Sequence, residues 1–177
     1  NLLEKNETIT NITPTADGIS ASSYSISTTL SSDLSFNTTS GIISGTPDTI
    51  STKQNYTITV TSTENDTYTT DISLNVYEFT YSSINNLLEK DVSITDITPV
   101  ISGVSTPSYS INPVLSTTGL DFSGTSGIIS GRPDTISAKQ NYTITATAAG
   151  EDYTADISLN VYGRDFHHLD ISVGLMF

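Results

Sequence analysis

The chain of 177 residues contains two histidines, His167 and His168, which lie side by side near its C-terminal end. Histidine is the side chain best suited to proton transfer near neutral pH. Neighbouring side chains on a strand point to opposite faces, so these two rings cannot chelate one ion together. The remainder of the chain offers no histidine for a Ser-His-Asp arrangement. The sequence therefore predicts a protein that is not an enzyme and has no catalytic residues.

Carboxylates offer a second kind of chemistry, because Ca²⁺ takes six to eight oxygen ligands in proteins. The candidate metal ligands are Glu64 and Asp66 in one polar segment, and Glu151 and Asp152 in another. Neither segment contains a dense Asp-x-Asp motif. We therefore expect solvated acidic loops and no cofactor, and calcium binding stays open as the alternative.

Glycans are a third candidate partner. Six asparagines begin an Asn-x-Ser/Thr sequon, the acceptor of N-linked glycans: Asn6, Asn11, Asn37, Asn55, Asn65 and Asn141. Glycan binding by the protein itself would need exposed aromatic rings, and the chain has no Trp. Tyr68 and Tyr153 are the tyrosines expected to be exposed. Glycosylation is thus a prediction, and a glycan-binding adhesion module is an alternative.

The charge of the chain excludes another class of partner. The formal net charge is −13, with 6 Lys and Arg against 19 Asp and Glu. A nucleic-acid-binding surface needs a basic patch that releases counterions, and this composition cannot supply one. No apolar run approaches the roughly 18 residues of a spanning helix, so we expect no membrane insertion by this segment.

Several segments occur twice, about 85 residues apart. NLLEK at residues 1–5 returns at 86–90, and SGIISG at 40–45 returns at 126–131. DISLNVY at 71–77 returns at 156–162. Such repetition predicts two copies of one structural unit. We place the first repeat at residues 1–77, the second at 78–162, and a C-terminal segment at 163–177.

Within each repeat, apolar and polar residues alternate over short segments bounded by Gly and Pro. The apolar positions include Tyr56, Ile58, Leu74 and Val76, and each of them has an apolar counterpart in the second repeat. A period of two places these side chains on one face of a strand, with Thr and Ser on the other. The pattern predicts an all-β protein whose repeats are two-sheet sandwiches.

Two segments carry a resemblance to a known family: LSFNTTSGIISGTP at residues 34–47 and YTITVT at residues 56–61. They resemble the immunoglobulin-like domains of prokaryotic surface proteins, close to the dystroglycan-type cadherin-like repeats. Residues 119–133 and 142–147 match the same pattern, with Arg132 in place of the usual Thr. The resemblance implies two tandem immunoglobulin-like (cadherin-like) β-sandwich domains. It also implies an extracellular or cell-surface location and a role as a spacer, stalk or adhesin module.

Some domains of this kind carry a Lys-Asn isopeptide crosslink. The residues to consider are Lys5 and Lys90 near the start of each repeat, with Asn75 and Asn160 in its last strand. Because Leu74 and Val76 face the core, the alternation points Asn75 outward. We therefore expect no crosslink.

The two ends of the chain differ. Residues 79–83 precede the second repeat as an apolar strand, and the first repeat has no counterpart to it. At the other end, Leu169, Ile171, Val173, Leu175 and Phe177 alternate with other residues and predict an extra C-terminal β-strand. This strand is a candidate donor strand for the first repeat of a neighbouring molecule. A fold-back onto its own second repeat, or a place in a larger membrane-embedded sheet, are the other interpretations.

These observations favour a structural subunit or stalk of an extracellular surface filament or adhesin, which self-associates head to tail. The alternative is a calcium- or glycan-binding adhesion module of a larger secreted or outer-membrane protein.

Overall fold

A computed structural model describes residues 1–31, 33–115 and 119–163 of the chain. Its strands are β1 (Leu2–Glu4), β2 (Ala21–Ile26), β3 (Leu34–Phe36), β4 (Ile43–Gly45), β5 (Ser51–Ser62), β6 (Thr67–Tyr81), β7 (Asn85–Glu89), β8 (Pro99–Ser102), β9 (Ser108–Asn112), β10 (Leu120–Phe122), β11 (Ile129–Gly131), β12 (Ser137–Ala148) and β13 (Glu151–Tyr162). The described residues contain no helix, and the predicted all-β fold is confirmed. His167, His168 and the expected strand at 169–177 lie outside the described residues.

The first repeat is a sandwich built on a sheet with the strand order β1-β6-β5-β2. The hairpin of β3 and β4 supplies the facing layer, and an isolated bridge joins Ile12 to Ile43. As the alternation predicts, Ile58, Leu74 and Val76 are buried in the core between these layers. Tyr56 is only half-buried at the edge of this core.

The second repeat has the same plan, with the sheet order β7-β13-β12-β9 and the hairpin of β10 and β11. β1 and β7 occupy equivalent places, because each runs parallel to the last strand of its repeat. Tyr142, the counterpart of Tyr56, is fully inside this core. The repetition seen in the sequence is therefore a repetition of architecture.

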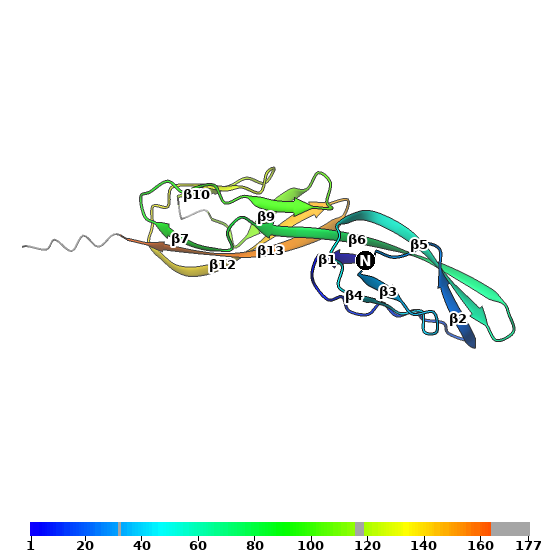
Figure 1. Cartoon of the computed structure of the whole chain (residues 1–177). Helices are drawn as coiled ribbons and strands as arrows, with labels where there is room; N and C mark the ends of the chain where they lie inside the picture. Colours follow the sequence, from blue (N-terminus) through cyan, green and yellow to red (C-terminus); the bar gives the residue numbers. More distant parts are fainter. Residues whose placement is uncertain (32, 116–118, 164–177) are drawn as a thin grey trace, which may run out of the picture.

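β6 belongs to both repeats. Its first part pairs with β5 and β1, and its last part, Glu78 to Tyr81, pairs with β8 of the second repeat. Figure 1 shows this strand leaving one sandwich and continuing along the next, so that the two lie end to end. The predicted boundary after Tyr77 thus falls inside one continuous strand, with no linker between the repeats.

The second repeat gains a pair of aromatic side chains from β6. Phe79 and Tyr81 are buried in its core, and the Tyr81 hydroxyl donates a 2.7 Å hydrogen bond to the carbonyl oxygen of Gly127. Residues 14–17 of the first repeat match β8 in sequence position, but these four described residues do not form a strand. The equivalent layer of the first repeat is therefore shorter.

We expect the buried Tyr81 hydroxyl to make the protein sensitive to alkali. Burial raises the pKa of Tyr81 well above its ordinary value. The unfolded chain loses the proton near pH 10 while the folded chain keeps it, so this contribution is present below about pH 10 and is lost as the pH rises further. Tyr81→Phe should lower the free energy of unfolding at pH 7 by about 1–3 kcal/mol, because the Gly127 carbonyl loses its partner.

Urea titrations at pH 7 and above pH 10 measure both effects. Tyr81→Phe should also make the alkaline decline less steep. Tyr68→Phe, at an exposed position, is the control and should change the stability at pH 7 by less than about 0.5 kcal/mol. An unchanged alkaline slope in Tyr81→Phe would contradict the prediction.

Candidate functional site

The most deeply buried polar arrangement that we find lies where the two repeats meet, and it is centred on Asn75 of β6. The side chain is 5% exposed. Its Nδ2 donates to the carbonyl oxygens of Ser51 at 2.7 Å and Gly103 at 3.1 Å. Its Oδ1 accepts a 3.2 Å hydrogen bond from the Tyr153 hydroxyl. One amide thus joins β5 of the first repeat to a loop and a strand of the second.

The expectation that Asn75 points outward needs a correction. The side chain does point away from the core of the first repeat, as the alternation with Leu74 and Val76 requires. At this end of the sandwich, however, outward is toward the second repeat rather than toward water. The amide is therefore engaged in the junction, while the Lys5 ammonium pairs with Glu78 at 3.5 Å instead.

Tyr153 was also expected to be exposed, and this expectation is wrong. The ring is 5% exposed because it packs edge-on against Tyr77, with ring centroids 4.7 Å apart and an interplanar angle of 76°. Burial raises the pKa of both hydroxyls, and the nearby Glu4 adds to the effect on Tyr77. Tyr68, which holds the same place in the first repeat, is 48% exposed as predicted.

The backbone comes very close at Gly103. This glycine has φ +76°, and a Cβ placed on it would lie 2.5 Å from the carbonyl oxygen of Val76. Leu2 of β1 completes the contact by packing against the core of the second repeat. The junction therefore combines a close backbone approach, an apolar contact and a buried amide.

An open cleft of about 270 Å³ borders this junction, with Asn75, Gly103 and Tyr153 among its lining residues. Lys53 and Glu151 also line it. The acidic candidates Glu64, Asp66, Glu151 and Asp152 are all exposed. Among the described residues, no group of three or more His, Asp or Glu side chains could hold a metal ion. The chemistry of the junction is suited to fixing two repeats together, and calcium binding stays the alternative prediction.

The sequon asparagines Asn6, Asn11, Asn37, Asn55, Asn65 and Asn141 are all exposed. Asn37 also orders a turn, since its Oδ1 accepts from the backbone N–H groups of Thr39 and Ser40 at 2.9 and 3.0 Å. Their accessibility is what a glycan acceptor requires, and glycosylation stays a prediction.

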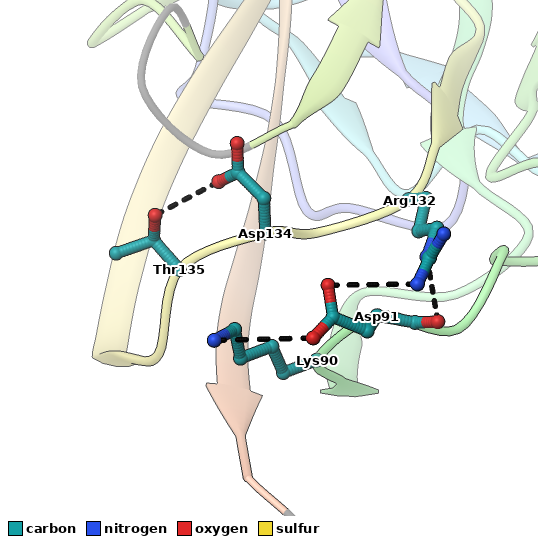
Figure 2. A network of polar contacts seen from close by, with 5 residues as sticks. All are labelled: Lys90, Asp91, Arg132, Asp134 and Thr135. Carbon is teal, nitrogen blue, oxygen red and sulfur yellow. Dashed lines mark hydrogen bonds and ion pairs between the residues drawn. The ribbon is translucent and has the colours of Figure 1, made fainter.

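The unusual Arg132 has a local role (Figure 2). Its Nε donates a 2.6 Å hydrogen bond to the Asp91 carbonyl oxygen, and its guanidinium lies 3.6 Å from the Asp91 carboxylate. Lys90 lies 3.9 Å from the same carboxylate. The first repeat has Asn6 and Thr46 at the matching positions, so it cannot form this ion pair. Both side chains are largely exposed, so the ion pair adds about 0–1 kcal/mol.

The sequence did not identify Asn75, Gly103 and Tyr153 as a junction. The one signal was the direct succession of Tyr77 and Glu78 without a flexible segment, which requires the repeats to touch. Which residues make the contact depends on the angle between the sandwiches.

One family model and several solved structures are similar to this chain. Residues 4–77 match the family described as "Putative Ig domain". Among solved structures, extracellular domains 3–5 of Drosophila OTK are similar at 15% identity and a TM-score of 0.40, over 92% of this chain and 62% of that one. A protocadherin gammaB7 EC3-6 structure is similar at 15% identity and a TM-score of 0.37, over 93% of this chain and 45% of that one.

The chain thus spans less than two thirds of the length of these structures. A search of curated proteins finds no match. The described part of the chain contains no helix that is long and apolar enough to cross a membrane.

Proposed function

Taking two immunoglobulin-like repeats joined by a fixed junction as the premise, we propose that the chain is a structural stalk or adhesin spacer. It would work outside the cell, as a non-catalytic part of a surface assembly. The observation that carries this proposal is the buried Asn75 amide, which holds Ser51 of one repeat and Gly103 and Tyr153 of the other. A fixed orientation is useful to a protein whose task is to hold other parts at a distance.

The cost of burying an amide supports this interpretation. A polar group removed from water stabilises a fold only when its hydrogen bonds are made with good geometry, so it favours one arrangement over others. An apolar side chain at position 75 would tolerate sliding between the repeats. The continuity of β6 acts in the same direction, since the connection between the sandwiches is itself hydrogen-bonded on both sides of the boundary.

A finer part of the proposal concerns assembly. Residues 169–177 would pair with the first repeat of a neighbouring molecule, beside residues 14–17. Support comes from the second repeat, where the equivalent β8 pairs with Glu78 to Tyr81. A donated strand would repeat this pairing, with main-chain hydrogen bonds and alternate side chains setting its register. Deleting residues 169–177 tests the idea: a self-association constant that is unchanged by the deletion would rule it out.

The proposed stalk function is tested by the distance between the repeats. The chain has no Cys, so spin labels can be attached at Ser25→Cys on β2 and Ser110→Cys on β9, both exposed positions. At dilutions where the chain is monomeric, pulsed electron spin resonance should give one narrow distance distribution. A broad distribution would exclude a fixed spacer. A distribution that narrows only when calcium is added would favour the calcium-binding adhesion module.

A further inference from the structure

The first repeat contacts the second through one end of its sandwich. The second repeat has the equivalent surface at its own far end, away from the first repeat. Leu2, Ile50, Asn75 and Tyr77 lie at the junction, and their counterparts are Leu87, Ile136, Asn160 and Tyr162. Leu2 packs against the core of the second repeat, and Ile50 lies against Gly103. The far-end residues Leu87, Ile136 and Tyr162 are 68%, 61% and 40% exposed. We call these three, with Asn160, the exit surface.

The surface of the second repeat that contacts the first repeat also has an equivalent. It lies on the outer end of the first repeat, away from the second. Gly103 and Tyr153 correspond there to Gly18 and Tyr68. Gly18 has φ +75°, nearly the +76° of Gly103, but a Cβ placed on it would meet nothing within 4 Å. Tyr68 is 48% exposed, whereas Tyr153 is 5% exposed. Gly18 and Tyr68 define the entry surface.

We propose that the exit surface of one molecule docks on the entry surface of a second copy of this chain, and so repeats the junction already present inside each molecule. The chain itself shows what covers such a surface, because the same side-chain types are covered when the first repeat meets the second. Tyr162 would pack against Tyr68 as Tyr77 packs against Tyr153. The Asn160 amide would meet the Gly18 carbonyl as Asn75 meets Gly103.

The exposed side chains provide the physical reason for the docking. Three large apolar groups gathered at one end of a small domain are typical of an interaction site rather than of a free surface. The backbone of Gly18 has the conformation that permits another backbone to approach closely, but no atom lies within 4 Å of a Cβ placed on it. Entry and exit surfaces lie on opposite ends of the molecule, so the contact is head to tail and extends into open chains.

This inference deepens the proposed stalk function by naming its partner, but it does not require residues 164–177. It also predicts how self-association depends on the salt concentration. Two chains of net charge −13 repel each other, so added salt should strengthen association by screening that repulsion. An assembly held by surface ion pairs would be weakened by salt instead.

Cross-linking between two full-length variants tests the geometry. Asp17→Cys places a thiol beside Gly18 of the entry surface, and Lys139→Cys places one beside Leu87 and Asn160 of the exit surface, both at exposed positions. Molecules of the two variants are mixed and treated with a short bismaleimide, which can join them only when the two surfaces meet. The matched control replaces Lys139→Cys with Val114→Cys, at a site that is 71% exposed and outside both surfaces. The mixed pair should cross-link at least about tenfold faster than the control pair. Equal rates would overturn the proposal.

Sedimentation of the full chain tests the energetics. Ile136→Asp places a charge in the centre of the exit surface and should weaken self-association by about tenfold or more. Val114→Asp adds the same charge outside it and should leave association unchanged. A native chain that stays monomeric at all concentrations and salt levels would overturn the proposal. That result would leave the stalk function standing, since the spin-label distances are measured in monomers.

Discussion

Replacing Asn75 with alanine should lower the free energy of unfolding by about 2–4 kcal/mol. The substitution removes three hydrogen bonds from a side chain that is 5% exposed and leaves Ser51, Gly103 and Tyr153 with unpaired groups. A buried group without its partner costs about 1–3 kcal/mol, and the neighbouring cleft lets water relieve part of this. Urea denaturation followed by fluorescence and by circular dichroism measures the loss.

Asn160→Ala is the matched control, because Asn160 holds the same place in the second repeat but is partly exposed. Its effect on the free energy of unfolding should stay below about 1 kcal/mol. Equal losses in the two variants would show that the asparagine stabilises each sandwich separately, and the junction would lose its central residue. Asn75→Ala should also broaden the distance distribution between spin labels on the two repeats.

An alanine at Gly103 should cost about 2–5 kcal/mol. About 1–2 kcal/mol of this comes from the left-handed backbone at φ +76°, which an L side chain adopts at a cost. The rest comes from the new methyl group, which would lie 2.5 Å from the Val76 carbonyl oxygen and 3.1 Å from the Tyr77 Cα. These are backbone atoms of β6 and cannot rotate away, so the repeats must separate.

Gly18→Ala isolates the two contributions. Gly18 has φ +75° and open space around it, so only the backbone cost of about 1–2 kcal/mol should remain. The difference between the two variants in thermal or urea unfolding therefore reports the close approach at the junction. No difference between them would mean that β6 moves aside without cost, which a rigid junction forbids.

The alternation of apolar residues was enough to predict the sandwiches. Ile58, Leu74 and Val76 lie where the period of two puts them, because each strand has one face against the core. The same rule could not predict the surroundings of Asn75. It separates the two faces of a strand, but it cannot tell whether the outer face meets water or another domain.

Tyr153 and Tyr68 illustrate the same limit. Both precede an alternating segment, and the two segments differ by few residues. Tyr153 is nevertheless 5% exposed and Tyr68 48% exposed. The difference arises because, in the described structure, the second repeat has a neighbouring repeat at the end where this tyrosine lies. The environment of such a residue depends on whether its repeat has a neighbour at that end. The sequence of a single repeat does not encode this environment. The Arg132 replacement was visible in the sequence, but its partner Asp91 emerged only from the fold.

The parallel pairing of β1 with β6, and of β7 with β13, has a mechanical consequence. The shorter strand of each pair comes early in its repeat, and the longer strand is the last of that repeat. A pull between the start of the shorter strand and the end of the longer one therefore drags the paired strands past each other along their length. The hydrogen bonds of the pair are then sheared together instead of being opened one after another. Because β6 passes from one sandwich to the next without a loop, tension is transmitted between repeats with no slack to take up first.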